Sequence, residues 1–283
     1  MKRKIIIADT AGVCFGVERA LKHSYEVTNK TEEGEEIYSL GPIIHNPQVV
    51  GDLEQRGVKV AKSLEDVRGR TVLIRAHGIP IETMEAARRR DLNVVDLTCP
   101  IVKKLQNCVK RLSQDGYFVV IVGDKKHPEV IGALSHADPE RVRVVEGRWE
   151  VDEDIISYRR VGVVAQTTIP YERLQEVVDT CLEMVDEVRV FNTICEDIYE
   201  KQREAKELAK TVDAMIIIGG RNSSNTTKIA KLCKEVNPST YHIEGADEVC
   251  KLDIQGKETI GITAGASTPP HIIKEVIDRL LEV

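Results

Sequence analysis

The sequence predicts an α/β protein made of three pseudo-symmetric units, and two observations support this. Short β-branched runs alternate with longer amphipathic segments along all 283 residues, a pattern typical of strand–helix–strand units with parallel sheets. Three motifs also recur three times in the same order. We therefore expect α/β units over residues 14–98, 99–191 and 192–283. Residues 1–13 should form a strand that packs on the first or the third unit.

The first motif is a strand, a short turn, a cysteine and the start of a helix. Cys14, Cys99 and Cys195 follow the predicted strands of residues 5–9, 93–98 and 188–192. Pro100 directly after Cys99 suits a first helical turn, where a missing N–H costs little. Helix N-termini stabilise thiolates, the form of cysteine that binds metal. The motif therefore predicts three metal-binding thiols in equivalent places.

The other two motifs are a strand that ends in glycine before a polar loop, and a strand that enters a small-residue turn ending in proline. The glycines lie 27, 24 and 24 residues after the cysteines, and the prolines 66, 71 and 74 residues after them. Ligands of open α/β sheets bind beyond the carboxyl ends of the strands. Units packed about a pseudo-threefold axis would therefore bring all these loops to one central site.

The odd number of cysteines, seven, argues against a disulfide framework. Structural zinc sites usually take four ligands in CxxC pairs, and no CxxC occurs in this sequence. Three thiolates on a four-iron cluster would leave one iron free to act as a Lewis acid on a substrate oxygen. The alternative is that the cysteines pack in the core, and we prefer that reading for the other four: Cys108, Cys181, Cys233 and Cys250.

Polar residues in the second and third motifs predict an anion site. His45 and His127 lie 31 and 28 residues after their cysteines, and the third copy has Ser223, Ser224 and Asn225 there. His77 in the third motif is matched by Thr167 and Ser267. Such donors on loops at helix N-termini suit phosphate oxygens.

Glu129 follows His127 by two residues and should lie in the first turn of a helix. The helix dipole alone favours a carboxylate there, so a structural role is one interpretation. The other is a proton donor beside a bound substrate.

Several classes of protein are disfavoured. The net charge of −6 argues against a nucleic-acid-binding surface. No run approaches the roughly 18 apolar residues of a membrane span, and the apolar run near the N-terminus is too short for a signal peptide. We therefore expect a cytoplasmic protein. Neither a Walker A motif nor a strand followed by GxGxxG is present, so no nucleotide cofactor is indicated.

The chain resembles the 4-hydroxy-3-methylbut-2-enyl diphosphate reductases of the methylerythritol phosphate route to isoprenoids. The resemblance runs from AGVCFGV at residues 11–17 to TAGASTP at residues 263–269. It includes GPIIHN, RAHG, DLTCP, HPEV, AQTT, NTIC and SSNT, in that order. So many matched segments over nearly the whole chain are highly specific, and no motif position departs from the pattern.

The resemblance implies a trefoil of three α/β units around a [4Fe-4S] cluster on Cys14, Cys99 and Cys195. The substrate hydroxyl would bind the open iron and leave as water, giving isopentenyl and dimethylallyl diphosphates. Glu129 would deliver the proton, with Thr168 and a water as the link. Reduced ferredoxin or flavodoxin would supply electrons, because the chain has no flavin or nicotinamide motif. The diphosphate would be held by His45, His77, His127, Ser223, Ser224, Asn225 and Ser267.

Three alternatives remain open at this point. The first is a non-redox iron–sulfur hydro-lyase or condensing enzyme, although its carboxylate substrates favour arginine forks over His, Ser, Thr and Asn. The second is an iron–sulfur redox sensor, which needs no anion pocket. The third is a zinc-stabilised α/β protein, which would be colourless.

Overall fold

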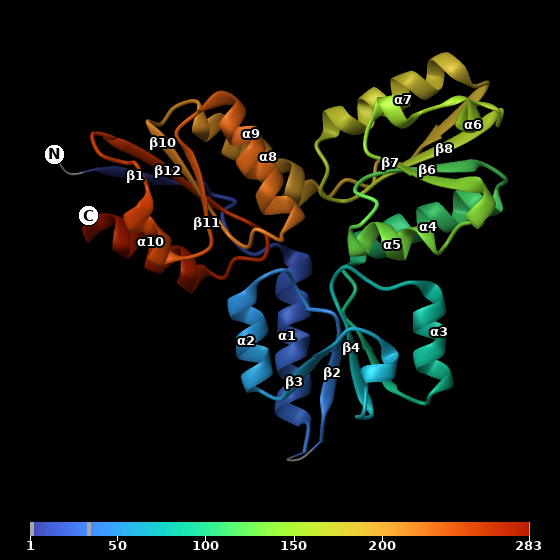
Figure 1. The fold of residues 1–283 in the computed structure, drawn as a ribbon, viewed down its shortest axis with the longest axis horizontal. Helices are drawn as coiled ribbons and strands as arrows, with labels where there is room; N and C mark the ends of the chain where they lie inside the picture. The colour runs from blue at the N-terminus through green and yellow to red at the C-terminus, as the bar shows by residue number, and fades with distance from the viewer. Residues whose placement is uncertain (1–2, 33–34, 283) are drawn as a thin grey trace. The chain divides into compact units, whose positions relative to one another are not determined.

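A computed structural model describes residues 3–32 and 35–282 (Figure 1). Over these residues the strands form three four-stranded sheets, and every strand pair is parallel. Helices connect the strands along the chain. The predicted α/β class with three repeated units is confirmed. Within the described ranges, no helix is long and apolar enough to cross a membrane.

The strands are short, and their bounds fall into three groups by sheet. The first sheet holds β1 (Lys4–Ile7), β10 (Ala214–Ile218), β11 (Thr240–Ile243) and β12 (Thr259–Ala264). The second holds β2 (Ile37–Leu40), β3 (Val58–Ala61), β4 (Thr71–Ile74) and β5 (Asn93–Asp96). The third holds β6 (Phe118–Val122), β7 (Val142–Val145), β8 (Arg160–Ala165) and β9 (Glu187–Val190).

The helices lie between these strands in sequence. Their bounds are α1 (Phe15–Lys30), α2 (Pro47–Gln55), α3 (Ile81–Arg89), α4 (Pro100–Gln114), α5 (Pro128–Leu134), α6 (Glu153–Ile156), α7 (Tyr171–Met184), α8 (Glu196–Ala209), α9 (Ser224–Val236) and α10 (Pro270–Glu282). A longer 3₁₀ segment, η4, covers Ala246–Lys251.

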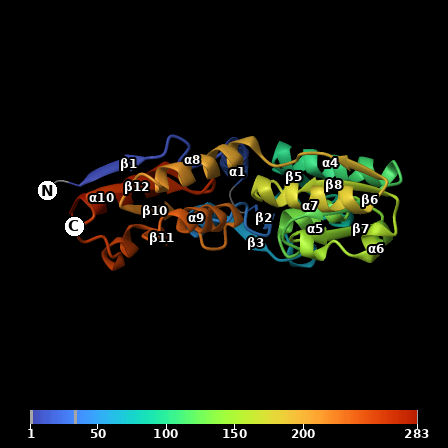
Figure 2. The same ribbon diagram turned by 90° about the horizontal axis from the view of Figure 1, so that it is seen from above.

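All three sheets have the same strand order. The orders are β3-β2-β4-β5, β7-β6-β8-β9 and β11-β10-β12-β1. In each sheet the last strand is the one that leads into a first-motif cysteine, so β5 and β9 belong to the sheet that precedes their cysteine. β1 likewise pairs with β12, with Lys4 opposite Thr259 and Ile7 opposite Ile262, as Figure 2 shows along one edge of the sheet. The first strand of the chain therefore completes the last sheet.

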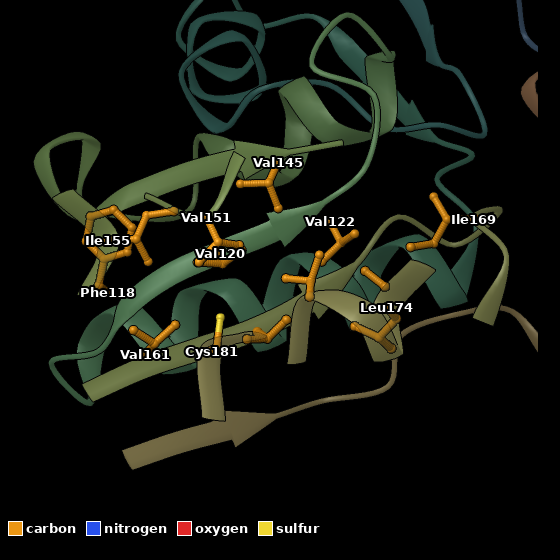
Figure 3. Close-up of a cluster of buried hydrophobic side chains, with 13 residues drawn as sticks. Phe118, Val120, Val122, Val145, Val151, Ile155, Val161, Ile169, Leu174 and Cys181 are labelled. Atoms are coloured by element: carbon orange, nitrogen blue, oxygen red, sulfur yellow. The ribbon is translucent and has the colours of Figure 1, made fainter. Parts of the chain in front are cut away.

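The central strands are buried on both faces, which explains their continuous apolar runs. In β10, Met215 and Ile217 pack with α8 and α9, whereas Ile216 and Ile218 pack with α10. The third sheet repeats this pattern. Figure 3 shows one of its layers, where Val120 and Val122 lie among side chains of β7, β8 and α7. These layers fix the strand ends from which the motif loops start.

The chain separates into two compact units. Unit 1 comprises Met1–Val17, His45–Gln48 and Glu196–Val283, and contains the first sheet. Unit 2 comprises Glu18–Ile44 and Val49–Cys195, and contains the other two sheets. The division at residues 98 and 191 into three separate domains therefore stays a prediction.

Candidate active site

The three repeat cysteines occupy equivalent positions in the fold. Each lies one residue before a helix: α1 begins at Phe15, α4 at Pro100 and α8 at Glu196. Each cysteine N–H also donates a hydrogen bond to a carbonyl at the same place in the third motif. The pairs, at 3.2, 2.9 and 2.9 Å, are Cys14 with Ala266, Cys99 with Ala76 and Cys195 with Thr167. Each thiol therefore has the same local backbone surroundings: the end of a strand, a third-motif turn and the start of a helix.

A buried lysine lies beside the first of these cysteines, in unit 1. Lys201 of α8 is 3% exposed, and its Nζ donates to the carbonyl of Gly12 at 3.0 Å. Burial lowers the pKa of Lys201, whereas the neighbouring Cys14 raises it. A buried cation at this position favours a thiolate on Cys14.

The loop before Cys14 is anchored by a second α8 residue, Glu204. Its carboxylate accepts hydrogen bonds from the N–H groups of Asp9 and Thr10, at 2.6 and 2.9 Å. Burial by itself raises the pKa of Glu204, but the hydrogen bonds from Thr10 and Asp9 lower it overall. Sequence reasoning missed Lys201 and Glu204, because neither lies in a repeated motif. Their three-residue spacing on the helix after Cys195 was the available signal.

These surroundings fit an iron–sulfur cluster. Cys14, Cys99 and Cys195 are all partly exposed. Each lies at a helix N-terminus, where the helix dipole attracts negative charge, and Lys201 adds a buried positive charge beside Cys14. The donor set is therefore three thiols in polar surroundings that stabilise negative charge.

The remaining cysteines divide into three cases. Cys181 and Cys233 are fully buried, as predicted, and burial raises the pKa of these thiols to about 11 and about 12. Cys108 is half-buried against the core below α4. The prediction for Cys250 was wrong: it is exposed. Its segment is the 3₁₀ turn η4, in which Val249 and Ala246 pack on the core instead.

In unit 2, Glu129 lies in the first turn of α5 and is 2% exposed. Its carboxylate accepts hydrogen bonds from the N–H of Thr167 at 2.6 Å and from the Oγ–H of the same residue at 2.9 Å. A buried carboxylate is tolerated when such donors satisfy it. The sequence indicates Thr167 only as a counterpart of His77, whereas the structure shows that it is a hydrogen-bond partner of Glu129. Thr168, the predicted link, follows in the same loop and accepts from Gln166 Nε2 at 3.2 Å.

Two predicted histidines lie together in unit 2. The rings of His77 and His127 are edge to face, with centroids 5.5 Å apart. His127 is the N-cap of α5, where its Nδ1 accepts from the N–H of Glu129 at 3.3 Å. The structure therefore brings His77, His127 and Glu129 into one cluster.

Unit 1 holds the serine and asparagine loops. Ser223 is the N-cap of α9, and its Oγ accepts from the N–H of Thr226 at 3.3 Å. Asn46 Nδ2 donates to the carbonyl of Ser267 at 2.9 Å, and Ser267 Oγ donates to the carbonyl of His45 at 3.3 Å. These bonds place the third-motif loop directly against the His45 turn.

Asn225 has a buried amide that is available to a ligand. Its side chain is buried, at 4% exposure, and neither its Oδ1 nor its Nδ2 has a hydrogen-bond partner within the part of the chain that the structure describes. A buried amide left unsatisfied costs about 1–3 kcal/mol. It lies in the first turn of α9, beside Ser223 and Ser224, where backbone N–H groups favour an anion.

Close approach of the loops in unit 1 depends on glycine. A Cβ at Gly220 would lie 2.8 Å from the carbonyl oxygen of His45, and one at Gly265 would lie 2.0 Å from Thr226 Oγ1. Side chains at these positions would push the His45 turn and the start of α9 out of place.

The predicted site residues thus fall into two sets. The structure places Cys14, His45, Ser223, Ser224, Asn225 and Ser267 in unit 1. It places His77, Cys99, His127, Glu129, Thr168 and Cys195 in unit 2. Their union in one central site stays a prediction.

The family model described as "LytB protein" matches residues 5–281. A relative from Geobacter sulfurreducens, named 4-hydroxy-3-methylbut-2-enyl diphosphate reductase, is 52% identical over 99% of this chain and 97% of its own length.

Two solved structures extend the comparison. One, of (E)-4-hydroxy-3-methyl-but-2-enyl diphosphate reductase, is 46% identical, covers 99% of this chain and 100% of its own, and has a TM-score of 0.73. The other, the corresponding reductase from Plasmodium falciparum, is 23% identical with a TM-score of 0.89, covers 98% of this chain and 88% of its own, and supports the fold alone. The family resemblance predicted from the motifs is confirmed: this chain belongs to the LytB protein family.

Proposed function

We propose that this chain is an oxidoreductase that removes the hydroxyl group of 4-hydroxy-3-methylbut-2-enyl diphosphate to give isopentenyl and dimethylallyl diphosphates. One observation carries the proposal: the chain is 52% identical, over nearly its whole length, to a relative named as that reductase. The reaction takes two electrons and two protons, and it releases one water. The chain must therefore hold an electron-transferring group, a diphosphate and a proton donor.

Cys14, Cys99 and Cys195 are the proposed ligands of a [4Fe-4S] cluster. Their equivalent backbone hydrogen bonds and helix starts support this choice over the other four cysteines. When bound, the cluster supplies electrons and one iron open to the substrate oxygen. Lys201 holds positive charge beside Cys14 and the Gly12 carbonyl.

The diphosphate is bound by neutral donors and imidazoles. Asn225 supports this assignment most directly, because its buried amide lacks a partner within the described ranges. Ser223 and Ser224 stand at the same helix N-terminus. His45, His77, His127 and Ser267 complete the proposed set. An anion that carries up to three negative charges gains most from such donors when water is excluded.

Glu129 is the proposed proton donor. The Thr167 N–H and Oγ–H groups both point at its carboxylate and fix its orientation. A charged carboxylate would repel the diphosphate, so substrate binding should raise the pKa of Glu129 and load it with a proton. Thr168 lies next to Thr167 in the loop and is the proposed link to the substrate.

Reduced ferredoxin or flavodoxin is the proposed source of electrons, and the cytoplasm the proposed location. The test is to purify the protein without oxygen, supply the allylic hydroxy-diphosphate with dithionite-reduced methyl viologen, and analyse the products. We expect a brown protein that bleaches in air and yields both isoprenoid diphosphates. An intact cluster that gives no product would contradict the proposal and favour a redox sensor; a colourless zinc protein would contradict the cluster.

A further inference from the structure

A groove of about 430 Å³ lies on unit 2, along α4. One side is the outer face of α4, and Arg19 of α1 and Phe191, just after β9, also line it. Lys103, Lys104 and Arg111 recur along α4 at spacings that put them on one face of the helix. The groove therefore runs along α4 and is bordered by α1 and by the segment after β9.

The charge of this groove is opposite to that of the whole chain. Four cations, Arg19, Lys103, Lys104 and Arg111, line it, although the net charge of the protein is −6. Two carboxylates near it offset part of this charge, since Asp96 pairs with Lys103 at 2.6 Å and Asp115 lies 3.9 Å from Arg111. The lining stays positive.

The groove also has an aromatic wall. The guanidinium groups of Arg111 and Arg189 lie over the Phe191 ring, 5.7 and 5.3 Å from its centroid. Phe191 is only half-buried. An apolar ring surrounded by exposed cations is the composition of a small protein-docking surface, where charge guides the encounter and a few apolar atoms hold it.

The position of the groove relates it to the proposed cluster. Thr98 and Pro100, the residues on either side of Cys99, line it, and Arg19 donates to the Thr98 carbonyl at 3.3 Å. Phe191 lies four residues before Cys195 in the same unit. A partner in this groove would touch the backbone that leads to two of the three proposed cluster ligands.

We infer that this groove docks an acidic, protein-borne electron carrier, so that electrons enter next to Cys99 and Cys195. The inference rests on the proposed function, which requires an external electron donor. Opposite charges speed the encounter of such partners by factors of 10 to 10³, and redox partners typically form small, transient interfaces. The steering weakens with salt, because the Debye length is about 8 Å at physiological ionic strength.

The test compares two electron sources with one set of variants of the anaerobically purified holoenzyme. The variant Lys104→Gln/Arg111→Gln removes two groove cations. Lys110→Gln is the matched control: it is an exposed cation on the same helix, and it does not line the groove. The sources are a reduced, acidic [2Fe-2S] ferredoxin and dithionite-reduced methyl viologen, a small radical cation.

We expect the double variant to raise the KM for ferredoxin by about tenfold. This KM should also change less with salt concentration than in the unmodified enzyme. Turnover driven by viologen should be unchanged. Lys110→Gln should match the unmodified enzyme with both sources. An unchanged KM for ferredoxin in the double variant would overturn the inference. If instead viologen drives no turnover even in the unmodified enzyme, the proposed function itself fails.

A second measurement does not depend on turnover or on the variants. Carbodiimide cross-linking joins carboxylates of the ferredoxin to nearby lysines of the unmodified protein. We expect the cross-links to map to Lys103 and Lys104, and to decrease as salt is added. Cross-links confined to lysines outside the groove would overturn the docking site.

Discussion

Each compact unit buries one charged side chain beside its candidate residues, and the two charges are opposite. Unit 1 buries Lys201, which donates to the Gly12 carbonyl two residues before Cys14. Unit 2 buries Glu129, which accepts two hydrogen bonds from Thr167. Burying either charge costs free energy of folding unless the charge has a partner. We therefore infer that each buried charge has a role in function.

The difference lies in what each charge can do. Lys201 bonds to a backbone carbonyl and acts on Cys14 through its charge, so its proposed task is to stabilise a cysteine-held anionic group. Glu129 is held by donors that fix its orientation, and a carboxyl group can still exchange a proton. We infer that the two charges serve retention of the cluster and proton delivery, respectively.

The largest expected effect comes from Glu129→Gln. The amide keeps the size of the side chain but cannot deliver a proton, so turnover should fall by about 10²–10⁴ while substrate binding remains. Single-turnover product formation at saturating substrate measures this. Exposed Glu140→Gln, in the same unit, is the control. Full activity in Glu129→Gln would remove this residue from the reaction.

The next effect concerns the partner of Glu129. Thr167→Val keeps the side-chain shape and the N–H donor but removes the Oγ–H donor to a buried carboxylate. We expect the free energy of unfolding to fall by about 1.5–3 kcal/mol, measured by urea denaturation. Thr180→Val, which removes an exposed hydroxyl bonded to the Glu176 carbonyl, should change it by less than about 0.5 kcal/mol. Equal losses in both variants would contradict the assigned role.

Lys201→Met tests the charge in unit 1. Without the cation beside Cys14, iron should be lost to a chelator about tenfold faster, equivalent to ~1.4 kcal/mol. The fold should keep its stability, because an apolar side chain of similar length avoids the cost of burying a charge. Lys201→Arg should hold iron normally, as should Lys206→Met, which removes a more exposed lysine of the same helix. Normal iron retention in Lys201→Met would show that the charge has another purpose.

The smallest effect is expected from Asn225→Ala. Its amide makes no hydrogen bond with the rest of the described chain. Removing an unsatisfied buried amide offsets the packing that the smaller side chain loses, so the free energy of unfolding should change by less than about 0.5 kcal/mol. Asn237 is the matched control, because its Nδ2 donates to the carbonyls of Ala209 and Val212, both at 2.9 Å. Asn237→Ala should lower the free energy of unfolding by about 2–3 kcal/mol, measured by thermal unfolding. A comparable loss in Asn225→Ala would mean that its amide supports the fold rather than a ligand.

The sequence predicted the parts of the molecule that repeat. Strand ends, glycine turns and cysteines recur at nearly constant spacing, so the three sheets and the helix starts at residues 15, 100 and 196 follow from the pattern. The pairing of β1 with β12 does not follow from the pattern, because the sequence of a strand does not determine which strand lies beside it. Cys250 was misread because a six-residue 3₁₀ turn resembles a short helix in spacing.

Contacts between distant loops were beyond sequence reasoning. Thr167 lies 38 residues from Glu129, and Lys201 lies 189 residues from Gly12. Neither pair leaves a periodic signal, because tertiary packing alone brings them together. The charged groove on α4 could not be predicted from the sequence either, because lysines and arginines at helical spacing usually indicate a solvent-exposed helix face.

The most direct test of this account is the iron and acid-labile sulfide content of single Cys→Ser variants purified without oxygen. We predict about four irons per chain in the unmodified protein, as a [4Fe-4S] cluster requires. Cys14→Ser, Cys99→Ser and Cys195→Ser should each lose most of this iron, whereas Cys250→Ser, at an exposed position, should keep all of it. Full iron in any of the three repeat variants, or its loss in Cys250→Ser, would contradict the account.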